Sequence, residues 1–176
     1  MKLRSFSTTI GCLVILAAGA AFAADSPLRQ LDYFQGTWMC KGTAFAMADA
    51  PEHATSGKLT GKWIMDGNWL EYRYDGMKTK ADPHAMSAAG FMGWDSEHRN
   101  FAMGGVCSDG CYSTESSPGW ENDVMIFTGP NHMGGMTVTG RDEFHKISAT
   151  EVKYVYQIEM NGSWQKAMEE TCKKSE

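Results

Sequence analysis

The sequence lacks several features that would place it in a common functional class. After residue 23 no hydrophobic run reaches the roughly 20 apolar residues that a membrane-spanning helix needs. Long helical runs rich in Ala, Leu, Glu and Lys are also missing there, which argues against a helical bundle or a coiled coil. The net charge is −5 and no basic cluster is longer than Lys173-Lys174. Nucleic acid and anionic membrane surfaces are therefore excluded as expected partners.

Recognised catalytic motifs are absent as well. The sequence has no Gly-x-Ser-x-Gly elbow, no phosphate-binding glycine loop, no His-Glu-x-x-His and no Cys-x-x-Cys pair. Its carboxylates, such as Asp66, Glu71, Asp95 and Glu143, fall mostly in expected turns or on polar strand faces, which predicts solvated side chains. We therefore favour a protein that is not an enzyme and holds no cofactor. A hydrolase-like enzyme with an unrecognised constellation at a barrel mouth stays an alternative, because such groups are recognised in space.

The first 23 residues have the pattern of a secretory signal peptide. Lys2 and Arg4 precede an apolar stretch over residues 10–22, and residues 21–23 form an Ala-Phe-Ala cleavage pattern. We expect cleavage after residue 23 and export to the periplasm or beyond the cell. The remaining residues 24–176 fit one domain, and losing Lys2 and Arg4 takes the net charge from −5 to −7.

The remainder of the chain predicts an all-β domain. A short helix opens it at Ser26-Pro27, with Leu28, Leu31 and Phe34 along one face. From Gly36 onward apolar residues recur with a period of two, which is typical of strands. About ten strands are expected, near residues 37–45, 59–65, 69–74, 86–94, 101–106, 112–116, 124–128, 136–144, 152–160 and 163–171. Because closing such a meander removes its edges, we predict an antiparallel up-and-down barrel.

The cysteines predict two disulfides. Four of the five cysteines lie beyond the signal segment, an even number in an oxidising compartment. Cys107 and Cys111 enclose a Ser-Asp-Gly turn that brings them within bonding range. Cys40 lies in the first expected strand and Cys172 at the end of the last, and these strands become neighbours only when the sheet closes. Of the three possible pairings, we predict Cys40–Cys172 with Cys107–Cys111.

Several runs resemble a known bacterial family. Residues 31–42, LDYFQGTWMCKG, resemble the opening of the domain of unknown function 1579 family, where a short helix leads into a Gly-x-Trp strand. Residues 61–72, 90–95 and 166–170 are similar to its second hairpin, central strand end and terminal strand. The resemblance spans residues 28–174 and implies a calycin-type, lipocalin-like barrel, with no activity or catalytic residue to transfer. The cysteines depart from the usual family pattern.

Large apolar side chains on expected inward positions indicate a lumen for a small hydrophobic molecule. Methionine adapts well to irregular apolar guests. The predicted ligand-binding residues are Trp38, Trp63, Met65, Met92, Trp94 and Met103. The alternative is a filled core, because a barrel of about eight strands is only just wide enough for one small ligand. The oligomeric state stays open.

A metal or haem site is the second functional alternative. His132, Met133 and Met136 lie on one glycine-containing loop, and their imidazole and thioether groups suit Cu(I), with Met103 or His145 as helpers. Nitrobindin-type barrels also begin with a Gly-x-Trp strand and hold haem iron through one histidine, for which His132 and His145 are the late candidates. Ordinary surface positions explain both histidines more simply, so no metal is assigned.

Overall fold

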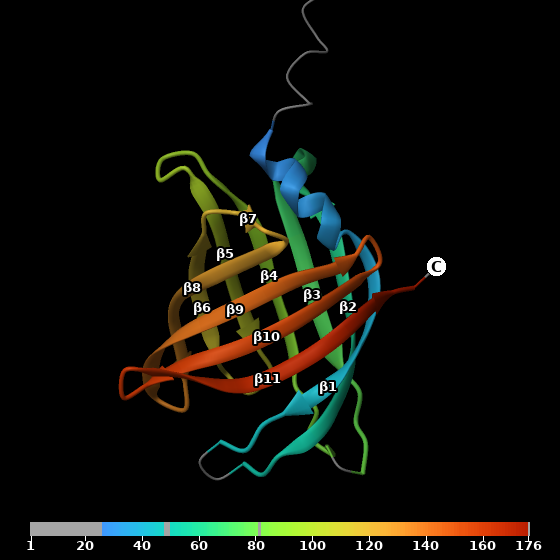
Figure 1. Cartoon of the computed structure of the whole chain (residues 1–176), viewed down its shortest axis with the longest axis vertical. Coiled ribbons are helices and arrows are strands. Elements are labelled where there is room, and N and C mark those ends of the chain that lie inside the picture. Colours follow the sequence, from blue (N-terminus) through green and yellow to red (C-terminus); the bar gives the residue numbers. More distant parts are fainter. Residues whose placement is uncertain (1–25, 48–49, 81, 176) are drawn as a thin grey trace, which may run out of the picture.

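The computed structural model describes residues 26–47, 50–80 and 82–175 (Figure 1). The expected signal peptide, residues 1–23, lies outside the described residues. Two short 3-10 helices, η1 (Pro27–Phe34) and η2 (Met65–Gly67), accompany the strands. The strands are β1 (Gly36–Ala44), β2 (His53–Ile64), β3 (Trp69–Gly76), β4 (Ser87–Asp95), β5 (Asn100–Cys107), β6 (Tyr112–Ser117), β7 (Trp120–Glu121), β8 (Val124–Met133), β9 (Met136–Ser148), β10 (Glu151–Met160) and β11 (Ser163–Lys174). Neither helix has the length and hydropathy that crossing a membrane requires.

The strands form one closed antiparallel barrel. Their order is β6-β5-β4-β3-β2-β1-β11-β10-β9-β8-β7, and an additional pairing of β6 with β8 closes the ring. Because β7 adds only Trp120 and Glu121 beside β8, ten strands make the wall. Figure 1 shows these strands wrapping around a common axis. The predicted up-and-down barrel of about ten strands is confirmed.

The helix η1 lies across one end of the barrel (Figure 1). Leu31 and Phe34 are buried there, and Trp38 at the start of β1 donates from Nε1 to the carbonyl of Phe34 at 3.2 Å. The sequence places Leu28, Leu31 and Phe34 three residues apart, a spacing that eclipses side chains in a 3-10 helix. The apolar face of η1 is therefore continuous, and it plugs this end.

The topology fixes what lies at the other end. Since η1 leads directly into β1, the turn between β1 and β2 lies at the end of the barrel far from η1. Every second turn of the meander after it lies at that same end. One of these is the predicted Asn161-Gly162 turn, where both residues have positive φ, at 53° and 75°. The turns 107–112 and 133–136 lie at the same end. They form the rim of the lumen away from η1.

Candidate functional site

A cavity of about 230 Å³ occupies the lumen of the barrel. Its inner end, beneath η1, is apolar and is lined by Phe34, Trp38, Leu59, Phe144 and Val152. Its outer end lies at the rim and is lined by Met86, Val106, Tyr112, Met133 and Met168. The lumen thus has an apolar floor with three aromatic rings and a methionine-rich mouth.

Between floor and mouth, polar side chains from six strands lie on the inner faces of their strands, and all but one of them line the cavity. Strand alternation places them there, as on β9, where Asp142 shares its face with the core residue Phe144. We call this set the polar belt; it consists of Tyr74, Glu115, Asn131, Asp142, Tyr154 and Glu170. All three of its acidic residues are buried.

One half of the polar belt is a hydrogen-bonded network around Asp142. The Tyr154 hydroxyl donates to Asp142 Oδ1 through a short hydrogen bond. Asn131 donates from Nδ2 to Glu115 Oε1 at 2.6 Å and accepts from the Tyr156 hydroxyl at 3.2 Å. Glu115 Oε2 is buried and has no hydrogen-bond partner of its own among the described residues, and the Asp142 carboxyl and the Ser113 side chain lie beside this acid. A proton shared by these two acids satisfies both.

The other half of the polar belt centres on Glu170. Thr55 Oγ1 and the Tyr74 hydroxyl both donate to Glu170 Oε1, each at 2.8 Å. Glu170 pairs in register with Tyr154 between β11 and β10, so the two networks are adjacent on the wall. Gly57 makes room for this arrangement, because a Cβ there would lie 2.3 Å from Cζ of Tyr74. The belt therefore requires a glycine opposite its tyrosine ring.

Burial changes the protonation of these groups. Desolvation, strengthened by the negative charge of Asp142, raises the pKa of Glu115 to about 9. Burial likewise raises the pKa of Asp142, against the hydrogen bonds from Glu115 and Tyr154. The pKa of Glu170 is also raised by burial, although hydrogen bonds from Thr55 and Tyr74 oppose this. Near neutral pH the Glu115–Asp142 pair keeps a proton.

Of the six predicted ligand-binding residues, two line the cavity and four lie elsewhere in the structure. Trp38 and Met103 line the cavity. Met92 is buried in the core and Trp94 packs edge-to-face on Phe101, both off the cavity lining. Trp63 donates from Nε1 to Asp32 Oδ1 at 2.9 Å, near η1, and Met65 lies in η2 with 68% of its surface exposed. Alternation identifies the inward face of a strand but does not say how far along the barrel a residue lies.

Both predicted cysteine pairs lie at disulfide distance, and all four residues line the cavity. The Cα atoms are 3.9 Å apart for Cys40 and Cys172, and 5.2 Å apart for Cys107 and Cys111. Glu170 lies beside the first pair, with its carboxylate and both Sγ atoms within 4.8 Å of one another. Since thiolates are the metal-binding form of cysteine, this cluster is no metal site while the sulfurs are bonded to each other.

The histidines considered for metal or haem lie outside the lumen. His132, Met133 and Met136 border a second, more open hollow at the rim. The His132 ring stacks on Tyr112 with centroids 4.2 Å apart and its Nδ1 lies 2.8 Å from Thr137 Oγ1. His145 alternates with the inward Phe144, so it lies on the outer face of β9. Haem held in the lumen by His145 does not fit this placement, and copper binding at the rim stays an untested alternative.

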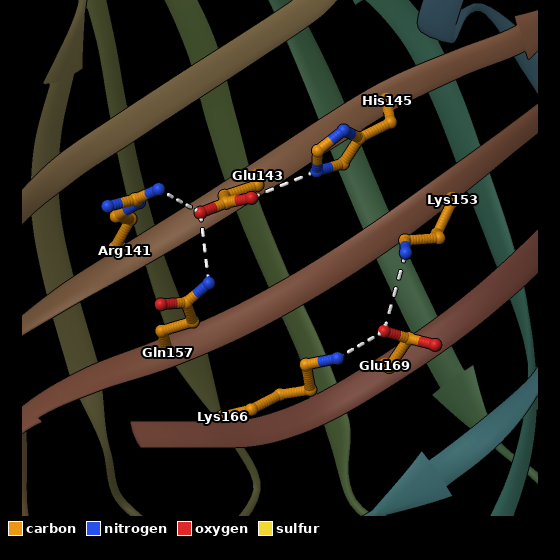
Figure 2. Close-up of polar contacts among 7 residues, drawn as sticks. All are labelled: Arg141, Glu143, His145, Lys153, Gln157, Lys166 and Glu169. Carbon is orange, nitrogen blue, oxygen red and sulfur yellow. Dashed lines mark hydrogen bonds and ion pairs between the residues drawn. The ribbon is translucent and has the colours of Figure 1, made fainter. Parts of the chain in front are cut away.

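A second polar cluster covers the outside of β9, β10 and β11 (Figure 2). Glu143 accepts from Gln157 Nε2 at 3.0 Å, faces His145 Nε2 at 2.9 Å and forms a close ion pair with Arg141. Its side chain is only 8% exposed, because these neighbours cover it. Sequence analysis predicted a solvated Glu143, and that expectation is wrong for this reason. The cluster ties adjacent strands together rather than forming a cleft.

Glu143→Gln is expected to lower the free energy of unfolding by about 2 kcal/mol, because it removes the charge that faces a partly buried Arg141. Glu169 offers a matched comparison on the same face, where it pairs with Lys166 and Lys153 but is 33% exposed (Figure 2). Glu169→Gln should cost less than about 1 kcal/mol. Urea unfolding of both variants measures the difference, and equal losses would contradict a special role for Glu143.

Comparisons with known proteins identify a family and a similar fold. A family model described as protein of unknown function, DUF1579, matches residues 24–174. The fold is similar to the crystal structure of Rv2717c from M. tuberculosis, with 13% identity, a TM-score of 0.65, and coverage of 85% of this chain and 98% of that one. A redesigned β-barrel also matches, with 13% identity, a TM-score of 0.44, and coverage of 84% and 96%. No curated protein matches the chain.

Proposed function

The chain belongs to the DUF1579 family, and for this member we propose that the barrel binds a small, largely apolar molecule in its lumen. The observation that carries the proposal is the cavity of about 230 Å³ between η1 and the rim. An apolar cavity of about 150 Å³ already accommodates benzene in a protein core. A filled core, the alternative from the sequence, would leave no such volume.

The lining supports a binding role rather than catalysis. Ligand sites are mostly apolar with a few polar groups that fix orientation, and here the floor is aromatic while the polar belt is confined to one level. Met86, Met133 and Met168 surround the mouth, where flexible thioether side chains adapt to a guest. We propose a carrier or envelope-binding role for this lumen.

We also propose that the protein acts as one exported domain, residues 24–176. The pattern of residues 1–23 supports export, as do two cysteine pairs at disulfide distance. Native mass spectrometry of protein purified from the periplasm tests the whole proposal. A retained organic mass supports it, whereas a retained metal ion or haem supports the rival class.

A cavity-filling variant tests the site directly. Ala88 lines the cavity, and its neighbour Ala89 points to the opposite face of β4. We expect Ala88→Phe to weaken binding of the apolar probe 1-octanol at least about tenfold in calorimetric titration, because the ring occupies the lumen. Ala89→Phe adds the same ring outside the lumen and should leave binding unchanged.

Thermal unfolding of both variants confirms that each is folded before titration. Unchanged octanol binding by a folded Ala88→Phe variant would contradict a site in the lumen. Failure of the unaltered protein to bind octanol would count against the proposed function itself.

A further inference from the structure

We propose that the lumen selects an apolar amine. The ammonium group of this amine donates hydrogen bonds to the free carboxylate oxygens of the polar belt. This inference rests on the proposed function, since it names the class of molecule that the same lumen would bind. Three observations support it. The hydrogen-bond donors of the belt are already used, the cavity wall carries acidic but no basic side chains among the residues that the structure describes, and apolar surfaces lie on either side of the belt.

The donors of the polar belt are already engaged. The hydroxyls of Tyr74 and Thr55 both donate to Glu170 Oε1. The Tyr154 hydroxyl donates to Asp142, and the Asn131 amide donates to Glu115. A ligand that needs hydrogen-bond donors therefore finds few free ones among the residues of the polar belt.

What the belt has left are acceptors. Glu170 is 2% exposed, lines the cavity and receives both of its hydrogen bonds at Oε1, so Oε2 has no partner in the described part of the chain. Glu115 is 5% exposed, and its Oε2 depends on a proton shared with Asp142. An ammonium group brings three N–H donors, which is the chemistry that these oxygens lack.

The charge of the wall points the same way. Asp142 and Glu170 line the cavity and Glu115 contacts Asp142, whereas no Lys, Arg or His lines the cavity among the described residues. A buried carboxylate without a cation is costly unless it keeps its proton. A bound ammonium supplies the missing cation, while a carboxylate ligand would add a further negative charge beside three acids.

The surroundings of Glu170 suit a cation with a hydrocarbon tail. Tyr154 lies next to it in register, which offers an aromatic ring beside the charge. Trp38, Phe144 and Val152 form the apolar floor on one side. An ammonium at the level of the belt can therefore extend its hydrocarbon part along apolar surface without burying another polar group.

Three probes of equal chain length separate the contribution of charge from that of the apolar tail: n-octylamine, 1-octanol and octanoate. Calorimetric titration at neutral pH is expected to give binding about tenfold tighter for n-octylamine than for 1-octanol, with octanoate the weakest. Glu170→Gln should remove most of this tenfold preference, because the amide keeps an oxygen for Thr55 and Tyr74 but carries no charge for the ammonium.

Glu169→Gln is the matched control. It removes the same charge from the neighbouring position, where the side chain faces Lys153 and Lys166 on the outside. It should leave all three affinities unchanged. If Glu170→Gln fails to fold, Glu115→Gln provides the second variant from the other half of the belt and should reduce the amine preference as well.

The possible failures are distinguishable. Octanol binding without a preference for the amine, or tighter binding of octanoate, overturns this inference and leaves the proposed function standing. An equal loss of amine binding in the Glu169 and Glu170 variants also overturns it, because the effect would then come from overall charge. Binding of none of the three probes to the unaltered protein would overturn the proposed function.

Discussion

Cys40→Ala, Cys172→Ala and the double variant are expected to lose the same free energy of unfolding, about 5 kcal/mol under oxidising conditions. The two residues are 132 positions apart, and a bond between them closes a loop of nearly the whole described chain. In the chain-entropy model this constraint on the unfolded state grows with loop length. Because either single change already removes the bond, the second change has little left to remove.

The short pair serves as the control for this experiment. Cys107 and Cys111 are 4 positions apart, so the same model gives only about 2 kcal/mol for their bond. Chemical denaturation of all variants, with and without a thiol reductant, measures both effects. Additive losses for the Cys40 and Cys172 variants, or a peptide map that joins Cys40 to Cys107, would contradict the predicted pairing.

The barrel could be predicted from sequence because an open meander of about ten strands would leave two unpaired edges. Alternating apolar residues indicate strands but do not say whether a sheet closes. Cysteines in the first and last strands fit the closed form, and in the structure Cys40 is paired directly with Cys172 in the register of β1 and β11. For β2 the local pattern predicted a strand only from residue 59, whereas the strand begins at His53. Its first residues form a strand because they pair with β1.

The polar belt was not predicted, although part of its signal is visible in the sequence. Glu115, Asp142 and Glu170 read as surface residues because buried acids are rare. Tyr72 and Tyr74, like Tyr154 and Tyr156, are two residues apart and so share one strand face. That spacing indicates a tyrosine-lined lumen, but only the closed structure shows that acids from other strands meet those rings.

The same buried acids predict an unusual dependence of stability on pH. The pKa of Glu115 is about 9 in the folded protein, against an ordinary value of 4.5, chiefly because burial disfavours the charged form. Below pH 4.5 the folded and unfolded states both hold this proton, so the group contributes its full stability. As the pH rises from there towards 9, the unfolded state releases a proton that the folded state retains, and stability falls.

Glu115→Gln is therefore expected to be more stable than the unaltered protein at neutral pH, by about 3 kcal/mol, with the difference vanishing near pH 4. Glutamine keeps an oxygen for Asn131 and offers an amide to Asp142, the two polar groups that face it from β8 and β9, while Ser113 lies beside it on β6. Urea unfolding at intervals from pH 4 to pH 9 measures the difference, and Glu121→Gln, an exposed glutamate on β7, should show none. A constant difference across this pH range, or one that grows as the pH falls, would show that Glu115 does not hold its proton in the folded barrel.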